Sequence, residues 1–389
     1  MLSKSILVRD GFFSTLFSLL ICYLLSLLFF NTAFFNPVSK AIQDFSFLDV
    51  YYAERLSKNE RINPEIVLIN VEHKSRHEIG LVLEKILVAK PKVVGFDVIL
   101  KEFKKTAADT LLASQLKSNN VINSVVLSAD KTIGNHPFFT FKKEPGFVNF
   151  NFDTQSTVIR EFVPQMQQSS INYESFSSLI AKIYLSKKYW DKFELKEKLQ
   201  ESRVINYQGN LEHFVHFTID EFMMLENKNI IKDKIILLGY LGTPTGNPFD
   251  VEDKHFTPLN ETTAGKSLPD MYGSVIHANI IAMMISNNFM YEVPQFWILL
   301  LTFLFSFLAS IYFIWLNKRL DISYRTVRKT ILFLFGIVLI WITLVLFKNG
   351  IVLKSAPIIA VTVFSAGFIK FYKHLVRYVQ TKRPFKSYM

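Results

Sequence analysis

Four long apolar segments stand out in this chain of 389 residues, and a longer mixed block separates the first from the other three. They are "GFFSTLFSLLICYLLSLLFFNTAFF" (11–35), "PQFWILLLTFLFSFLASIYFIWL" (294–316), "ILFLFGIVLIWITLVLF" (331–347) and "IVLKSAPIIAVTVFSAGFIKFY" (351–372). Each approaches the roughly 20 apolar residues that cross the core of a bilayer. The pattern predicts four membrane helices around one polar block.

The first segment has two interpretations. Lys4 and Arg9 supply the positive start of a signal peptide, but the apolar run exceeds the roughly 7 to 15 residues of a signal core, and no small-residue cleavage site follows closely. We therefore predict an uncleaved anchor over 1–35, an outer domain over 36–293, a three-helix membrane region over 294–376 and a basic tail over 377–389.

Within the outer block, short buried-strand patterns alternate with helical spacing. Strands are predicted at 65–71, 92–100, 121–129, 203–207 and 234–240, and helices at 78–90, 107–117, 175–185, 218–225 and 273–290. Such alternation is typical of a parallel sheet covered on both faces. We expect an α/β fold, with a Rossmann-like, mostly parallel sheet in one domain and long inserts at 130–173 and 241–272.

The distribution of charge along the chain decides whether a nucleic-acid partner is expected. The net charge of +11 would favour a nucleic-acid binder, but residues 36–293 hold 29 Lys and Arg against 31 Asp and Glu, and the remaining residues hold 15 against 2. The excess basic charge therefore lies beside the membrane helices, and no nucleic-acid partner is expected.

The position of the basic residues also predicts the topology. The loop 317–329 carries five basic residues, and the segment after Ile369 carries six. Because short Lys- and Arg-rich loops stay in the cytoplasm, both termini are expected on the cytoplasmic side of the membrane, with residues 36–293 extracytoplasmic. The single cysteine, Cys22, lies in the first apolar segment, so the outer domain has no disulfide.

Seven segments in order carry a family resemblance. They are "EIVLINVEHKS", "KVVGFDVIL", "GFVNFNFDTQSTVIREFVP", "SFSSLIAKIYL", "INYQG", "KDKIILLGYLGTPTGNPFDVEDKHFTPL" and "GSVIHANIIAMMISNNFM". Together they resemble the CHASE type-two family, the extracytoplasmic sensory domains of bacterial receptors, which three membrane helices and an output enzyme commonly follow. The resemblance implies sensing and signal transduction.

The chain also departs from the family pattern. The family usually has Ile-Asp-x-x-Ser after its first strand, whereas this chain has Asn70 and Glu72, with Ser75 in place. The family's tryptophan-and-arginine stretch is missing, and no output domain is expected within these residues.

The densest cluster of candidate chemistry is "FDVEDKHFTPL" (249–259). Asp250, Asp253 and His255 could be metal ligands, an acid/base group or part of a solvated polar loop. No second His or Cys cluster at a recognised spacing accompanies them, and the alternating oxygen ligands of a calcium loop are missing, so no metal site is predicted.

Other candidates follow the predicted strands. Glu72, Asp97 and the turn "GYLGT" (239–243) lie near carboxyl ends of strands, where parallel sheets bind ligands. Alternatively, Asp97 caps a loop or pairs with a base such as Arg160, because a buried carboxylate needs a partner. The glycine turn lacks the Gly-Lys-Ser/Thr ending of a phosphate loop.

Two polar residues lie in the predicted helix 273–290. His277, among aliphatic residues, is either a satisfied core histidine or a ligand contact, and Asn279 could hydrogen-bond the insert 241–272. The ligand-binding candidates are therefore Glu72, Asp97, Arg160, Asp250, Asp253, His255, His277 and Asn279.

No catalytic residues and no cofactor are predicted, because the chain has neither a Gly-x-Ser-x-Gly elbow nor an HExxH helix. We expect a non-enzymatic receptor that binds an unidentified small molecule or envelope signal and relays it to a separate membrane or cytoplasmic signalling partner. The lipid bilayer is a further partner, and a homo-oligomer is left open.

The alternative is a scaffold or assembly subunit of an envelope complex, in which small residues of "LFSFLAS" (303–309) pack helices closely.

Overall fold

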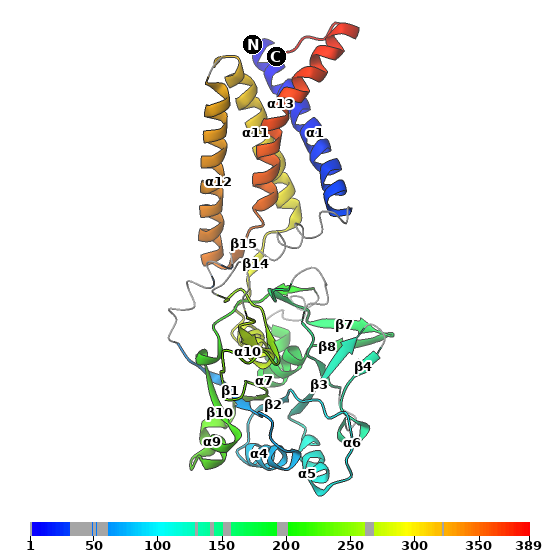
Figure 1. The fold of residues 1–389 in the computed structure, drawn as a ribbon, viewed down its shortest axis with the longest axis vertical. Helices are drawn as coiled ribbons and strands as arrows, with labels where there is room; N and C mark the ends of the chain where they lie inside the picture. The colour runs from blue at the N-terminus through cyan, green and yellow to red at the C-terminus, as the bar shows by residue number, and fades with distance from the viewer. Residues whose placement is uncertain are drawn as a thin grey trace. The chain divides into compact units, whose positions relative to one another are not determined.

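The computed structural model describes residues 2–31, 49, 52, 61–128, 131–140, 144–150, 157–192, 201–260, 268–320 and 323–389. The chain forms two compact units, one of residues 43–290 and one that combines residues 1–42 with 291–389. Figure 1 shows the helices and strands of both. The predicted boundary at residues 35 and 36 lies outside the described residues.

A mostly parallel sheet forms the centre of the 43–290 unit. Five of its parallel strands are β1 (Asn63–Asn70), β2 (Val93–Phe96), β3 (Val121–Ser128), β10 (Phe214–Thr218) and β11 (Ile235–Gly239). They lie in the order β10–β1–β11–β2–β3, with β4 (Lys131–Ile133) antiparallel to β3 and β5 (Gly146–Phe147) parallel to it. The predicted α/β class with a mostly parallel sheet is confirmed.

Three strand assignments differ from the sequence prediction. Strand β2 ends at Phe96 rather than at residue 100, because the chain turns away and the backbone N–H of Leu100 bonds the side chain of Asn135 at 2.6 Å. The segment predicted at 203–207 contributes only β9 (Arg203–Val204), which pairs with β6 (Glu161–Phe162) outside the central sheet. Edge strand β10 was not predicted.

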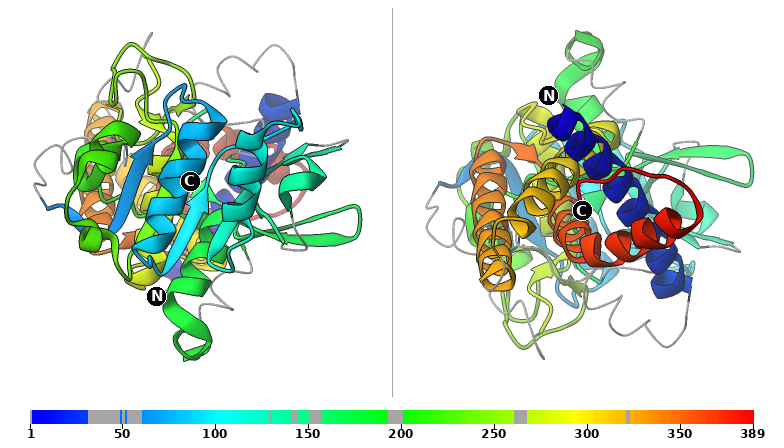
Figure 2. Two further views of the ribbon diagram at one scale, coloured as in Figure 1. Left: turned by 90° about the horizontal axis from the view of Figure 1, so that it is seen from below. Right: turned by 90° about the horizontal axis from the view of Figure 1, so that it is seen from above.

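Helices cover both faces of this sheet, as the predicted alternation requires. Helices α4 (Arg76–Val88), α5 (Ala107–Leu116) and α9 (Ile219–Met224) cover one face, and α7 (Phe176–Lys192) and α10 (Gly273–Ile285) contact strands from the other (Figure 2). Successive side chains of each strand point to opposite faces of the sheet. Val67, Ile69 and Leu238, for example, pack with the α4, α5 and α9 side chains in one buried cluster.

Short elements complete the unit. They are α6 (Pro137–Thr140), β7 (Gln165–Gln168), β8 (Ile171–Glu174), β12 (Lys254–His255), β13 (Met271–Tyr272) and the 3-10 turns η2 (Leu211–His213) and η3 (Lys228–Ile231). Strand β12 pairs with β13, and β13 directly precedes α10. This pairing therefore fixes the middle of the insert 241–272 next to the start of α10.

Local sequence signals explain where the helices begin. Ser75 and Glu78 form a reciprocal capping box at the start of α4, and Thr218 and Glu221 form another at the start of α9. Ser75 is the family residue that this chain retains, and its observed role is to start α4.

Helix α10 is apolar on all sides, and the sheet explains why. All its residues from Gly273 to Met284 are buried, since α7 and strands β1 and β11 surround it. Gly95 in β2 allows this layer to approach closely, because a Cβ there would lie only 2.6–2.7 Å from side-chain atoms of Ile180, Leu237 and Phe176.

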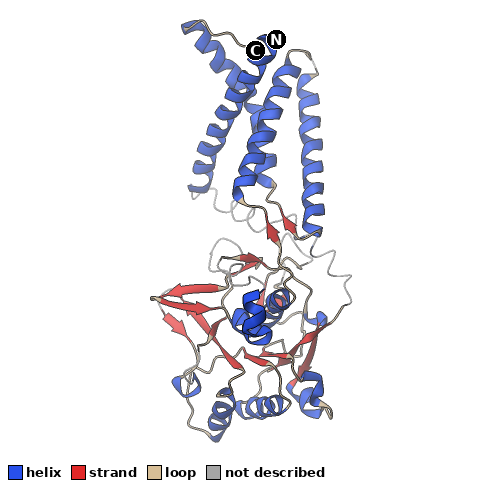
Figure 3. Ribbon diagram, turned by 180° about the vertical axis from the view of Figure 1, so that it is seen from behind, coloured by secondary structure: helices blue, strands red, loops and turns tan. Residues whose placement is uncertain are grey.

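The second unit contains four described helices long and apolar enough to cross a membrane. These are α1 (Leu2–Asn31), α11 (Gln295–Asn317), α12 (Tyr324–Lys348) and α13 (Ala356–Lys382). Figure 3 shows these four helices in blue, with only the short strand β15 between α12 and α13. The prediction of one helix before the α/β block and three after it is confirmed.

The fourth apolar segment starts differently from the prediction. Its first residues form β15 (Ile351–Val352), which pairs in parallel with β14 (Tyr291–Glu292), and α13 begins only at Ala356 with Pro357 in its first turn. Proline is favoured there because its missing N–H costs nothing at a helix start. An ion pair between Lys354 and Glu292, at 3.3 Å, lies beside the strand pair.

Small polar residues line the interior of this helical unit. Helices α1, α11 and α13 pack extensively on one another, and α12 contacts them less. The Thr15 hydroxyl donates to Ser310 Oγ at 3.1 Å, which joins α1 to α11. Further buried hydroxyl residues are Ser14, Ser18, Thr302, Ser306, Thr362 and Ser365. Small side chains of this kind allow membrane helices to approach closely.

One end of the helical unit is strongly basic. Four helix ends lie there: the start of α1, the end of α11, the start of α12 and the end of α13. Figure 1 marks the two chain termini at this end. Asp10 accepts hydrogen bonds from the Ser387 hydroxyl (2.6 Å) and the Tyr388 N–H (2.7 Å), while Lys318 lies over the Tyr388 ring. The last residues of the chain are therefore packed on α1.

Candidate functional site

The carboxyl ends of β1, β11 and β2 meet at one edge of the central sheet, where the registers align Asn70 with Gly239 and Leu238 with Phe96. Ligands of open parallel sheets bind at such edges. The position of each predicted candidate relative to this edge therefore decides whether it could contact a ligand.

Asn70 holds two loops of this edge together. Its Oδ1 accepts hydrogen bonds from the N–H groups of Glu72 (3.0 Å) and Leu241 (2.9 Å). Its Nδ2 donates to the Gly242 carbonyl (2.7 Å) and to the Thr245 hydroxyl (2.8 Å). The side chain is fully buried, so this departure from the family pattern has an architectural role.

Asp97 lies directly after β2 and faces the start of α10. Its Oδ2 accepts a hydrogen bond from the Ser274 hydroxyl at 2.8 Å. Burial raises the pKa of Asp97 to about 6, and the bond from Ser274 lowers it only in part. The alternative partner from the sequence is wrong, since Arg160 pairs instead with Asp49, at 2.6 Å between Nη2 and Oδ2.

Asp253 lies in the same region of the edge, carried there by the insert 241–272. Its backbone has a left-handed φ of 54°, a conformation that aspartate tolerates better than most residues, and its carbonyl accepts from the Gly273 N–H at 2.9 Å. Burial, the charge of Asp97 and the charge of Glu252 together raise the pKa of Asp253 to about 7. Two carboxyl groups thus share one neighbourhood, and each resists losing its proton.

His255 borders this pair. Its Nε2 lies 3.9 Å from Asp253 Oδ1, and its ring meets the Phe150 ring edge-on with centroids 5.4 Å apart. Burial lowers the pKa of His255. The neutral imidazole can therefore exchange hydrogen bonds with whatever occupies the edge.

Asp250, the third member of the predicted cluster, is engaged in the loop itself. Its Oδ2 accepts from the Tyr240 hydroxyl (2.5 Å) and the Thr243 N–H (3.1 Å), and its Oδ1 accepts from the Glu252 N–H (3.0 Å). These bonds lower its pKa, the bond from Tyr240 most of all. Its lone pairs are largely occupied, so its observed role is to shape the loop 240–252.

His277 is a core histidine. Its ring lies between Phe150 and Phe176, with centroids 4.6 and 5.2 Å away, and its Nδ1 is 2.9 Å from Ser177 Oγ. Burial lowers the pKa of His277 to about 3, with a smaller contribution from His255. The ring is neutral at physiological pH and joins α10 to α7.

Asn279 satisfies backbone groups. Its Oδ1 accepts from the N–H groups of Gln208 (2.7 Å) and Gly209 (3.3 Å), and its Nδ2 donates to the carbonyls of Gly209 (2.9 Å) and Val275 (3.0 Å). The predicted hydrogen bond to the insert 241–272 is present, since Asn279 Nδ2 lies 3.8 Å from Met271 Sδ, but the shorter bonds go to residues 208 and 209.

Glu72 lies after β1 with a left-handed φ of 45°, and its side chain is half-buried at the strand-end edge. Of the eight candidates, the structure brings Asp97, Asp253 and His255 together and leaves Glu72 at the same edge. The other four candidates form ion pairs, hydrogen bonds or ring contacts within the protein; they are Arg160, Asp250, His277 and Asn279. We refer to Asp97, Asp253, His255 and Ser274 as the acidic edge.

Sequence reasoning missed two residues of this region. Ser274 occupies the second position of α10, where the segment "YGSVIH" offered only a helix start as a signal. Asp270 accepts from both the N–H (2.8 Å) and the hydroxyl (2.5 Å) of Thr257, and burial raises its pKa to about 6. It lies just beyond the dense "FDVEDKHFTPL" run.

The acidic edge can exchange protons or attract a positive charge. Among the described residues, no group of three or more His, Cys, Asp or Glu side chains is arranged to hold a metal ion. The two carboxyl groups titrate near neutral pH, so a cationic group placed beside them would favour their ionised forms.

An α/β unit together with four helices long and apolar enough to cross a membrane is typical of a multi-pass membrane protein with one folded domain between its first and second spans. A scan of family profiles matches residues 21–312 to the CHASE2 domain. The protein belongs to the CHASE2 domain family, a family of sensory domains, as the sequence resemblance predicted. No match was found among curated proteins or solved structures.

Proposed function

We propose that this protein is a receptor that binds an extracytoplasmic ligand at the acidic edge and relays the signal through its membrane helices to a separate partner. The observation that carries the proposal is the pair Asp97 and Asp253, whose carboxyl groups have pKa values of about 6 and 7. Strongly perturbed groups at the ligand edge of a parallel sheet are typical of functional sites.

The chemistry of the edge favours a ligand that brings a positive charge. Such a ligand would place a positive charge beside Asp97 and Asp253, which form no ion pair with a Lys or Arg in the described part of the chain, and neutral His255 would add a hydrogen bond. The half-buried ring of Phe150, next to His255, would suit an apolar portion beside the cationic group.

Relay requires that the ligand prefer one arrangement of the chain, because equal affinity for two arrangements shifts neither. Helix α10 carries Ser274 at its first turn and leads along the sequence to β14 and α11. A change in the contact between Ser274 and Asp97 would therefore act on the element that precedes the membrane region.

The basic end supports a bacterial inner-membrane location with both termini in the cytoplasm. Basic residues of α1, α11, α12 and α13 gather at that end, and the other end carries few. The rule that positive loops remain inside then leaves residues 43–290 outside the cytoplasm.

The proposal is tested with the full chain in detergent. Water-soluble envelope extract is separated by ion exchange, and each fraction is assayed for a shift in the melting temperature of the protein. We expect a fraction retained on a cation exchanger to stabilise the wild type and to lose most of its effect on Asp253→Asn. Glu252→Gln is the matched control, since it removes one charge from the same loop and its side chain faces His73.

Two results together would overturn the proposal: no fraction stabilises the wild type, and deletion of the gene changes no signalling output. If instead Asp253→Asn and Glu252→Gln respond alike, the binding site lies elsewhere on the unit.

The scaffold alternative relied on small residues of the segment 303–309. Ser306 is fully buried within the helical unit, and its neighbour Ser310 bonds Thr15 of α1, so these residues pack helices of the chain itself. The receptor is therefore the function we favour, and we propose no enzymatic activity for it.

A further inference from the structure

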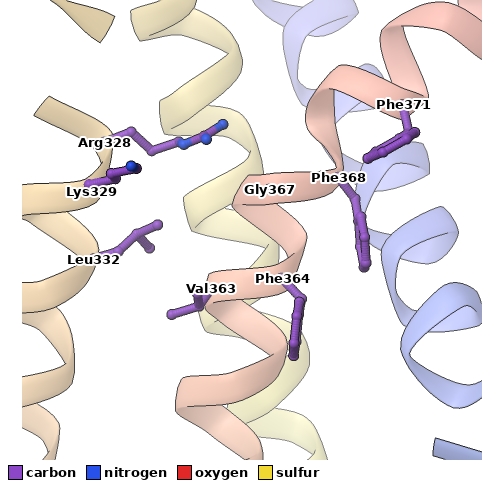
Figure 4. A pocket seen from close by; sticks show the side chains of 8 residues that line it. All are labelled: Arg328, Lys329, Leu332, Val363, Phe364, Gly367, Phe368 and Phe371. Atoms are coloured by element: carbon purple, nitrogen blue, oxygen red, sulfur yellow. The ribbon is translucent and has the colours of Figure 1, made fainter. Parts of the chain in front are cut away.

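Helix α12 stands apart from the close packing of α1, α11 and α13, and a pocket of about 320 Å³ lies between it and α13. Figure 4 shows Arg328, Lys329 and Leu332 extending from α12 and Val363 extending from α13 toward them. The other lining residues are Phe364, Gly367, Phe368 and Phe371.

The pocket has a charged mouth and an apolar wall. Arg328 and Lys329 lie in the second turn of α12, next to the connection that reaches the basic end, and no acidic residue lines the pocket. The remaining lining side chains are aliphatic or aromatic. This arrangement of cations above hydrocarbon matches the two parts of an anionic phospholipid.

Gly367 keeps the wall open. A Cβ at this position would meet no atom within 4 Å, so the absence of a side chain leaves space at the surface of α13. At the same level, Arg328 Nη1 donates to the Ala366 carbonyl at 3.1 Å. One such bond orients the guanidinium and leaves its other N–H donors for an anion.

We propose that this pocket binds an anionic phospholipid of the leaflet at the basic end, with its phosphate at Arg328 and Lys329 and acyl carbons against Val363, Phe364 and Gly367. Basic pockets between membrane helices commonly bind such headgroups. The volume is at the lower limit of small-molecule sites, so it admits the phosphate and part of one chain. The lipid would fill the gap that separates α12 from α13.

The experiment titrates phosphatidylglycerol or phosphatidylcholine into the full chain in non-ionic detergent and counts bound lipids by native mass spectrometry. Lys329→Gln removes one headgroup contact, and we expect about fivefold weaker binding of phosphatidylglycerol with little change for phosphatidylcholine. Gly367→Leu places a side chain in the open wall, where a Cβ would meet no atom within 4 Å, and we expect at least tenfold weaker binding of phosphatidylglycerol.

Arg325→Gln is the matched control, because Arg325 lies on the same helix, is exposed and does not line the pocket. Its affinity for phosphatidylglycerol should equal that of the wild type, and melting temperatures of all variants should show that each is folded. Equal losses in Arg325→Gln and Lys329→Gln, or unchanged binding in Gly367→Leu, would mean general surface attraction and would overturn the proposal.

Discussion

One buried amide, that of Asn70, joins the end of β1 to the loop after β11 through two accepted and two donated hydrogen bonds. An aspartate at this position could accept the same two bonds but could not donate to the Gly242 carbonyl. The amide nitrogen thus determines how this chain builds the ligand edge.

We predict that Asn70→Asp destabilises the full chain by about 2–4 kcal/mol, because a buried carboxylate would face a carbonyl oxygen. Thermal melting in detergent measures the loss. Asn63→Asp is the control, since Asn63 is half-buried and its Oδ1 accepts from the Glu65 N–H, a bond that aspartate retains. The Asn63 Nδ2 donates to Gln208 Oε1, and that side-chain amide can turn to donate to a carboxylate instead. A control variant as unstable as Asn70→Asp would contradict the assigned role.

Asp253 makes stability depend on pH in a predictable direction. Its folded pKa of about 7 lies above the ordinary value of 3.8, so between pH 4 and 7 the folded state holds a proton that the unfolded state has lost. Stability from this group is therefore present at acidic pH and is lost as the pH rises through 7. Nearby Asp97 and Glu252 contribute to the shift, and His255 adds little charge because its pKa is lowered.

We predict that the melting temperature of Asp253→Asn exceeds that of the wild type at pH 8 and nearly equals it at pH 4. The Asp253 side chain keeps 44% of its surface exposed, so solvent limits the gain to a few degrees. A difference that does not change between the two pH values would show that Asp253 ionises normally.

The positions of the candidate site residues could be predicted from the sequence only in part. The strand-end rule correctly brought Asp97 to the ligand edge, but it could not reveal that Asp253, far along the chain, would lie near it. Nor could it show that Asp250 would be engaged by Tyr240, because hydrogen-bond partners depend on how the loop closes. The partner of Arg160 was misjudged for the same reason.

Among the elements, the segments with strong apolar periodicity were the most predictable. Strands β1, β3 and β11 and helices α4, α5 and α9 lie within a few residues of their predicted bounds. Strand β10, "FVHFT", was missed because a short edge strand with a histidine shows no distinct buried pattern. The apolar run after Asp97 misled the assignment of β2, since its side chains are buried by loops.

The contact between α1 and α11 permits a direct test. With Cys22 replaced by Ser, we predict that Thr15→Cys and Ser310→Cys form a disulfide on mild oxidation, because their hydroxyl oxygens are 3.1 Å apart. Protease cleavage in the intervening unit followed by a non-reducing gel detects the link. Thr15→Cys paired with Leu334→Cys, an exposed position on α12, should stay unlinked.

For the whole molecule, the arrangement of charge leads to a topology that labelling can check. In the Cys22→Ser background, we predict that a cysteine at Ser114 reacts with a membrane-impermeant maleimide in intact spheroplasts. A cysteine at Arg325 should react only after lysis. Both side chains are exposed, so access alone distinguishes them, and the reverse pattern would contradict the proposed orientation.

The strand pair β14–β15 has a mechanical consequence for the whole chain. Tyr291 and Glu292, the first residues after the 43–290 unit, are hydrogen-bonded to the turn between α12 and α13 as well as continuous with α11. A pull or twist delivered along the backbone at Met290 is thus divided between two attachment points. We expect such a displacement to act at the same time on the start of α11 and on the connection before α13, whereas a chain without this strand pair would pass it to α11 alone.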